Sequence, residues 1–162
     1  IVERAQVPFG SLYQYFPDKT AIIGTLAERY NATGRACVEK ELAQVRSAAD
    51  LHPALCRMVD GFYRMYQEEP VLRDICQPTQ ADPALKQLDD EDCRYLASLL
   101  RDAVRRFSDR DDKTIATFAE LTITLIAAAV RQAITLKPKQ GRDMIALFKQ
   151  MLPRDLRALQ GL

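Results

Sequence analysis

The chain has 162 residues, of which 48% are hydrophobic and 28% charged, and its formal net charge is +1. These values fit a soluble globular protein with one sizeable core. The near-zero charge excludes a global attraction to nucleic acid or membrane, so any polyanion site must be local. Six glycines and an almost complete lack of β-branched alternation predict an all-α fold.

The first part of the chain divides at turn residues. Residues 1–5 are predicted to end one helix, and residues 8–16 to form a short second helix after a tight turn. Asp18 is well placed to cap a long helix over residues 19–47. Because the chain opens inside a predicted helix, we expect further sequence to precede it, and targeting cannot be judged.

The middle of the chain predicts a helix over residues 53–69, then a short helix that starts at Pro70 and is ended by Pro78. A long helix follows Asp82 and ends near Ser108, with a bend possible near Asp89-Asp90.

The last part begins with a helix over residues 113–136, capped by Asp111 or Asp112. Its apolar run over residues 114–130 contains Glu120 and is shorter than the ~20 residues that a bilayer needs. It therefore predicts a buried helix and no membrane span. Pro138 and Gly141 should separate it from an amphipathic helix over residues 142–160, which Pro153 should kink or restart.

The cysteines and the single histidine carry little functional signal. No C-x-x-C pair and no histidine cluster accompanies them, which favours reduced thiols in a cytoplasmic protein over a disulfide framework or a zinc site. His52, beside a predicted helix start, is expected in a loop. The four cysteines are Cys37, Cys56, Cys76 and Cys93.

The stretch "VPFGSLYQYFPDK", residues 7–19, holds too many aromatic residues for one buried helical stripe. Val7, Leu12 and Phe16 fall on one side, so several other side chains must face outward. A short helix that presents polar and aromatic groups after a tight turn is typical of a helix-turn-helix in a major groove. Lys19, in the first turn of the next helix, would bind a phosphate together with the helix amides. A plain packing helix is the alternative.

The segment "ERAQVPFGSLYQYFPDKTAI" closely resembles the end of the DNA-binding domain of the tetracycline-repressor (TetR) family. That family's pattern is A-x-x-A-G-V-S-x-G-S-L-Y-x-Y-F-x-x-K-x-x-L. Gln6 departs from its turn glycine and Pro8 from its capping serine. The motif covers about the first twenty-five residues, and the matching positions are Val7, Gly10, Ser11, Leu12, Tyr13, Tyr15, Phe16 and Lys19.

The resemblance implies that residues 8–16 are a recognition helix. Tyr15 and Lys19 would then anchor phosphates, and the groove-facing positions would be Phe9, Gly10, Ser11, Tyr13 and Gln14. It also implies two domains. Residues 1–46 would hold the C-terminal part of the DNA-binding head with the linking helix, and residues 47–162 a helical domain for ligand binding and dimerisation.

Candidates for the ligand pocket are aromatic, sulfur-containing and small polar side chains, which suit a small-molecule site. The same stripe at helical spacing is also what an ordinary core shows. The candidates are Met58, Phe62, Tyr63, Tyr66, Cys76, Tyr95, Phe118 and Thr122.

Two helices per chain could build the four-helix dimer interface that the family implies. An internal hairpin in a monomer is the alternative. The residues expected at the interface are Leu121, Leu125, Ala128, Ile145, Phe148 and Leu152.

No catalytic constellation is visible, and no cofactor or metal is expected. The acidic segment "LDDEDCR", residues 88–94, is interpreted as a solvated bend, because it lacks the glycine and terminal glutamate of an EF-hand loop.

We therefore predict a homodimeric DNA-binding regulator, a repressor that a small molecule releases from a palindromic operator. An activator or architectural DNA binder with the same head is one alternative. Another is a helical ligand carrier or protein-interaction module whose head does not bind DNA.

Overall fold

The computed structural model describes residue 16 and residues 18–159, and within them it contains helices and no strand. The all-α prediction is confirmed. The helices are α3 (Lys19–Ala43), α4 (Leu51–Glu68), α5 (Pro70–Ala81), α6 (Pro83–Arg105), α7 (Asp112–Thr135) and α8 (Pro138–Met151), with two short 3₁₀ turns, η1 (Ala48–Asp50) and η2 (Leu156–Leu159).

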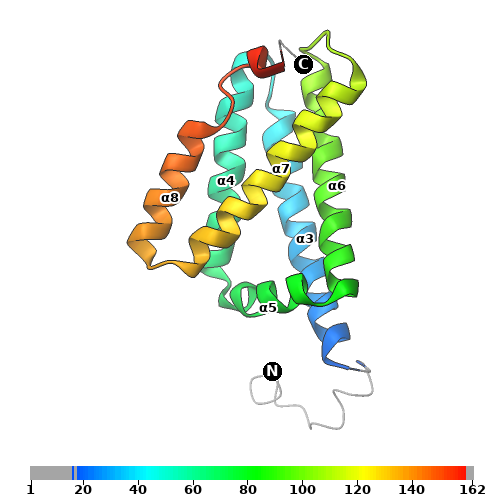
Figure 1. Ribbon diagram of the computed structural model, residues 1–162, viewed down its shortest axis with the longest axis vertical. Coiled ribbons are helices and arrows are strands. Elements are labelled where there is room, and N and C mark those ends of the chain that lie inside the picture. The colour runs from blue at the N-terminus through cyan, green and yellow to red at the C-terminus, as the bar shows by residue number, and fades with distance from the viewer. Residues whose placement is uncertain (1–15, 17, 160–162) are drawn as a thin grey trace.

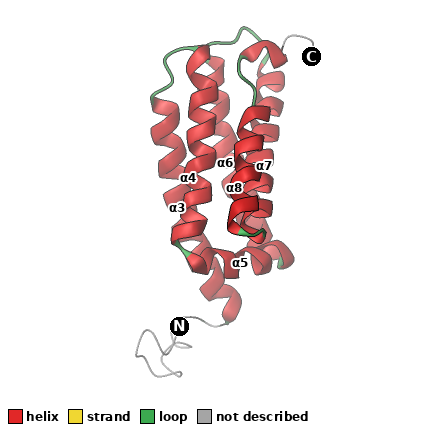
Figure 2. Cartoon of the chain, turned by 90° about the vertical axis from the view of Figure 1, so that its left-hand side faces the viewer, coloured by secondary structure: helices red, strands yellow, loops and turns green. Residues whose placement is uncertain are grey.

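Five of these helices run lengthwise and α5 lies across one end of the bundle (Figures 1 and 2). The N-terminal turns of α3 extend past α5 at that end (Figure 1). The main hydrophobic core lies between α3, α4, α6, α7 and α8, with Leu55, Met58 and Leu100 fully buried. A second, smaller cluster joins α3, α5 and α6 through Ile23, Ala27, Leu72, Ile75 and Leu85.

The predicted N-caps are confirmed at two helices, and a third cap, Asp82, begins α6. Asp18 Oδ1 accepts a hydrogen bond from the Ala21 amide at 2.8 Å. The Asp82 side chain likewise accepts hydrogen bonds from amides at the start of α6. At the start of α7, Asp111 Oδ1 accepts a hydrogen bond from the Thr114 amide at 3.0 Å. Each side chain satisfies an amide that the first helical turn leaves without an intrahelical partner.

Several predicted helix ends are wrong. The long helix α3 ends at Ala43, because Ser47 forms a capping box with Asp50 and begins η1. The next helix, α4, already begins at Leu51. Pro78 does not end α5, which continues to Ala81. Proline removes one amide donor there, yet the turn persists, and the Asp82 amide donates to the Pro78 carbonyl at 3.0 Å at the end of the helix.

The start of α8 is also corrected, since the helix begins at Pro138 and includes Gly141. Proline at the first helical position costs nothing, because its missing amide would have no partner in any case. Pro153 does terminate the helix, which ends at Met151 and is followed by η2.

Within the described residues, α7 is the one helix long and apolar enough to cross a membrane, with a mean hydropathy of 1.5 over 18 residues. Length and composition alone are weak evidence, because core helices share them. Here Ile115, Ile126 and Val130 of α7 are buried in the main core. One face of the helix therefore packs into the core of the bundle, and another carries the exposed Leu121 and Leu125.

Gly141 sets the approach of α8 to its neighbours. A Cβ atom at this position would lie 2.6 Å from the Ala133 carbonyl oxygen of α7 and 2.6 Å from the Tyr63 hydroxyl of α4. Both distances are too short for a carbon–oxygen contact, and the carbonyl is fixed within a helix.

We predict that Gly141→Ala lowers the free energy of unfolding by about 1–3 kcal/mol, because α8 must move away from the core. Urea denaturation measures this change. Gly24→Ala is the matched control, since its Cβ would meet Leu85 Cδ2 at an ordinary 3.5 Å. This control should be neutral or stabilising by up to about 1 kcal/mol. Equal effects of both changes would contradict the close-approach role of Gly141.

Candidate functional site

A cavity opens between α3, α4, α6 and α7, and we call it the core cavity. Its volume is about 80 Å³, and it is partly open to solvent. Residues from both hydrophobic clusters contribute to its wall. The residues that line it are Tyr30, Asn31, Gly34, Phe62, Met65, Tyr66, Leu72, Asp89, Asp92, Cys93, Leu96, Ile123, Ile126, Ala127, Val130 and Arg131.

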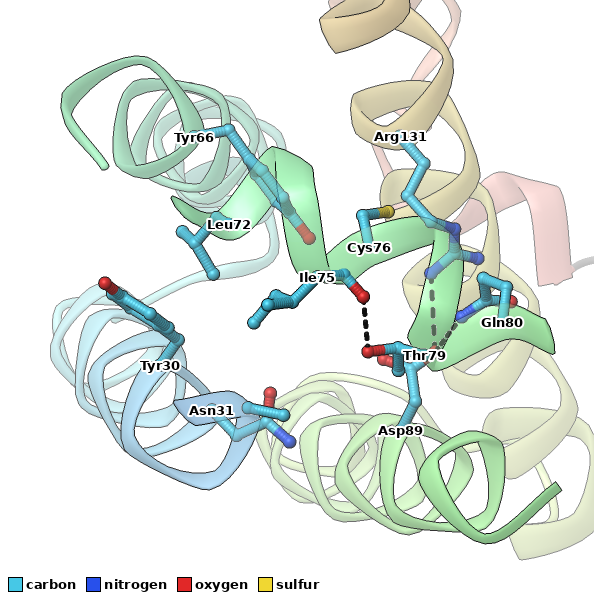
Figure 3. A pocket seen from close by; sticks show the side chains of 11 residues that line it. Tyr30, Asn31, Tyr66, Leu72, Ile75, Cys76, Thr79, Gln80, Asp89 and Arg131 are labelled. Atoms are coloured by element: carbon cyan, nitrogen blue, oxygen red, sulfur yellow. Dashed lines mark hydrogen bonds and ion pairs between the residues drawn. The ribbon is translucent and has the colours of Figure 1, made fainter. Parts of the chain in front are cut away.

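A second cavity adjoins the first beside α5, and we call it the α5 cavity (Figure 3). The two share Tyr30, Asn31, Tyr66, Leu72, Asp89 and Arg131. The α5 cavity adds the side chains of Ala27, Ile75, Cys76, Thr79 and Gln80.

The wall of the core cavity is mostly apolar. Phe62, Met65 and Tyr66 reach it from α4, and Ile126 and Val130 from α7. An apolar wall with a few polar groups is typical of sites for small organic molecules.

Gly34 lets α3 come close to this wall. A Cβ atom there would lie only 2.9 Å from Phe62 Cε1, so the glycine leaves room for the phenyl ring. The packing of Phe62 is thereby coupled to the backbone of α3.

Asp89 belongs to a polar network at the boundary of the two cavities. Its Oδ2 accepts a hydrogen bond from Gln80 Nε2 at 2.8 Å and lies 3.6 Å from Arg131 Nη1. Figure 3 shows both side chains pointing at this carboxylate. The charge of Asp89 is therefore compensated within the site.

Asp92 lies one turn further along α6 and is less well satisfied. Its Oδ1 is buried without a hydrogen-bond partner among the described residues, although Arg35 Nη1 lies 3.4 Å away. That distance makes an ion pair whose geometry does not form a hydrogen bond. Burial raises the pKa of Asp92 to about 6, against the opposing effect of Arg35. The carboxyl group thus titrates near neutral pH.

The buried thiols and the Tyr66 hydroxyl of the site are held neutral. Burial raises the pKa of the Cys93 thiol to about 11, and it also raises the pKa values of the Cys76 thiol and the Tyr66 hydroxyl. These groups act as hydrogen-bonding surface, and the thiols have no thiolate character at neutral pH.

The histidine likewise activates no nucleophile. His52 Nδ1 lies 3.2 Å from the Pro153 carbonyl oxygen, and its Nε2 lies 3.5 Å from Cys56 Sγ. Burial raises the pKa of the Cys56 thiol, the opposite of what an activated cysteine shows. His52 is in the first turn of α4, and not in the loop that the sequence predicted. Among the described residues no three His, Cys, Asp or Glu side chains gather to hold a metal ion.

Three of the eight side chains predicted for the pocket line a cavity. Phe62 and Tyr66 line the core cavity, and Cys76 lines the α5 cavity. The other five line neither. Met58, Tyr63 and Thr122 are buried, Phe118 packs against the main core, and Tyr95 is exposed.

The polar members of the site on α6 were not predicted from the sequence. The whole acidic segment was interpreted as solvated, but of its four carboxylates only Asp90 and Glu91 are exposed, and Asp89 and Asp92 face the cavity. The signal was present, because Leu85, Asp89, Asp92 and Leu96 follow the i, i+4, i+7, i+11 spacing of a buried helical stripe. Two carboxylates in such a stripe indicate a polar site inside the fold.

The predicted interface residues divide between the surface and the interior. Leu121, Leu125 and Ala128 are exposed on α7, whereas Ile145 and Leu152 are buried within the protomer and Phe148 is half-buried. The exposed apolar side chains of α8 are Leu147 and Met151.

Of the residues predicted to contact DNA, the structure describes Lys19, which is exposed at the first position of α3. The remaining predicted contacts lie outside the described residues, and they are Phe9, Gly10, Ser11, Tyr13, Gln14 and Tyr15.

An all-helical bundle with an apolar cavity at its centre is the class of protein that this geometry defines. A family model described as "Tetracyclin repressor-like, C-terminal domain" matches residues 49–159. The chain therefore belongs to the tetracycline-repressor family of regulators. No curated protein and no solved structure matches it.

We predict that Asp92→Asn stabilises the protein at pH 7.5, because it removes a buried charge. The native state keeps the Asp92 proton to higher pH than the unfolded chain does, so native Asp92 lowers stability as pH rises from 3.8 to about 6. The variant should gain on the order of 1–2 kcal/mol at pH 7.5 and nothing at pH 3.5.

Thermal unfolding at both pH values measures this difference. Asp90→Asn is the control, since Asp90 is exposed and pairs with Lys86 at 2.6 Å on the surface. Its effect should stay within about 0.5 kcal/mol. A destabilised Asp92→Asn protein at pH 7.5 would show that the Arg35 pair outweighs the burial of the charge.

Proposed function

We propose that the chain is the regulatory body, with part of the DNA-binding head, of a ligand-released transcriptional repressor. Residues 1–46 supply the end of the head and the linking helix, and residues 47–162 supply the ligand-binding and dimerisation domain. The protein works in the cytoplasm as a homodimer on a palindromic operator. Its partners are double-stranded DNA and a small-molecule effector, and it needs no cofactor, catalyses no reaction and contacts no membrane.

The observation that carries this proposal is the course of α3. The helix starts at Lys19, directly after the head motif, and lines the core cavity with Tyr30, Asn31 and Gly34. At 1.5 Å per residue the cavity begins roughly 17 Å along the helix from Lys19. A ligand that displaces Phe62 would press on α3 at Gly34 and so move the head.

Such movement matters because two heads must fit successive major grooves. Half-sites of a palindromic operator lie about 34–36 Å apart, which fixes the separation of the recognition helices. A ligand that binds better to the protein with another separation lowers the affinity for DNA by its differential affinity for the two states.

The exposed faces of α7 and α8 support the homodimer. Leu121 is 57% exposed and Met151 is 73% exposed, with Leu125 and Leu147 also exposed on the same two helices. Large apolar side chains gathered on a surface favour a protein interface. Two helices from each protomer would form a four-helix contact.

The first test is fluorescence anisotropy of the full-length protein on DNA from upstream of its own gene, compared with scrambled DNA at two salt concentrations. Sequence-selective, salt-sensitive binding supports the regulator. The absence of binding by a folded dimer would favour the ligand carrier or interaction module instead.

In the same assay we predict that Lys19→Ala weakens binding to every DNA sequence and lowers the salt slope by about one, because one phosphate contact is lost. Lys40→Ala is the matched control, since Lys40 is exposed in the last turn of the same helix. It should leave the slope unchanged. An unchanged slope for Lys19→Ala would remove the phosphate role from this residue.

We also predict that the double change Leu121→Glu and Leu125→Glu shifts the protein from dimer to monomer, because four carboxylates would be buried in one interface. Sedimentation equilibrium measures the shift. Both side chains are exposed in the protomer, so its fold should be retained. Ala36→Glu, at an exposed position of α3, is the control and should stay dimeric. A dimer that survives the double change would place the interface elsewhere.

A further inference from the structure

We infer that the molecule bound in the core cavity is an organic cation, with an apolar body against the α4 and α7 wall and a positively charged nitrogen paired with Asp92. The inference rests on the proposed ligand-binding function and adds to it the chemical class of the effector.

The hydrogen-bonding capacity of the Asp92 carboxyl group is not satisfied. Its side chain is only 11% exposed, and the buried Oδ1 has no hydrogen-bond partner among the described residues. Leaving a buried acceptor unpaired is costly, and more so for a charged one. A ligand that brings a positive charge or a donor to this oxygen would recover that energy on binding.

Arg35 cannot fill this role from inside the cavity. Its guanidinium carbon lies 5.7 Å over the ring of Tyr95, and the side chain is 37% exposed. The Tyr95 hydroxyl is itself fixed by donation to Glu39 Oε1 at 2.9 Å. Arg35 is thus held on the outer side of Asp92 and does not line the cavity.

The charges of the side chains that line the core cavity do not cancel. The charged side chains that line the core cavity are Asp89, Asp92 and Arg131. Arg131 is paired with Asp89, which also holds Gln80. With Asp92 ionised, the side chains that line the cavity therefore carry one net negative charge, which Arg35 offsets in part from outside the wall, and this charge favours cations over anions.

Aromatic side chains form part of the same cavity wall. The rings of Tyr30, Phe62 and Tyr66 line the same cavity. Aromatic faces attract organic cations and suit an apolar body. A bare divalent metal ion does not fit, because it needs several oxygen ligands and Asp89 is already engaged.

Binding should depend on pH with a defined sign. The charged and titratable groups around Asp92 are Arg35 and Tyr30 from α3, Asp89 and Cys93 on α6, Arg131 from α7 through Asp89, and Tyr66 from α4, which also presents Phe62 and Met65. A cation binds the ionised carboxylate, so its affinity should rise with pH up to and beyond about 6. At pH 5 only about one-tenth of the free protein has this group ionised, which weakens binding about tenfold.

The test compares benzyltrimethylammonium with neopentylbenzene, its uncharged carbon isostere, on the full-length protein. The quaternary nitrogen has no proton to lose, so any pH dependence comes from the protein. Methyl NMR of Ile126 and Val130 locates both probes and gives the dissociation constants at pH 7.5 and pH 5. We expect the cation to bind at least about tenfold more tightly at pH 7.5 and to lose that advantage at pH 5.

Two variants assign the effect to one side chain. Asp92→Asn keeps the shape of the carboxyl group and should make both probes bind equally at both pH values. Asp90→Asn, an exposed neighbour on α6, should keep the wild-type preference.

Equal binding of both probes by the wild-type protein, or a preference that persists in Asp92→Asn, would overturn the inference and leave the proposed ligand site intact. If neither probe shifts the Ile126 and Val130 methyl signals, the inference also fails, and the proposed function is then tested by operator binding alone. The assay contains no DNA, so it decides these points independently of operator binding.

Discussion

Two carboxylates on the inward stripe of α6 are the constraint on which the rest of this structure depends. Asp89 and Asp92 stand between Leu85 and Leu96, where an ordinary core helix would carry apolar side chains. Charged groups cannot pack directly against apolar walls without partners. The two hydrophobic clusters therefore do not merge at this level, and the core cavity lies between them. Arg131, Gln80 and Arg35 are the groups that compensate the charges.

The charges of the two carboxylates are compensated unequally, and this difference determines which ligand the site favours. Asp89 is satisfied inside the fold, but Asp92 keeps a buried oxygen without a hydrogen bond and a pKa raised by burial to about 6. A site that lowers the stability of the empty protein can recover that energy from a ligand, which links binding to conformation. The helix α3 passes both Gly34 and Lys19, so the same element would carry the change from cavity to DNA.

Much of the fold could be predicted from the sequence, because the signals are local. Asp18, Asp82 and Asp111 cap helices as their positions indicate. Pro78 and Gly141 were wrongly predicted to break helices: Pro78 lies inside α5, and Gly141 lies inside α8, where the close approach of α7 and α4 leaves no room for a Cβ atom. The site was harder to predict. Aromatic and sulfur-containing residues are core by default, as Met58 shows, and a cavity depends on how whole helices pack. The spacing of Asp89 and Asp92 was the overlooked clue.

The most direct test of this account is the pKa of Asp92 itself, followed by ¹³C NMR of its carboxyl carbon between pH 3.5 and 8, with Asp92→Asn to assign the signal. The account predicts a midpoint near 6 in the free protein, which falls when benzyltrimethylammonium is bound, because a cation favours the ionised form. A midpoint at or below the ordinary 3.8 would contradict it, since Arg35 would then already satisfy the carboxylate and the cavity would hold no unpaired charge.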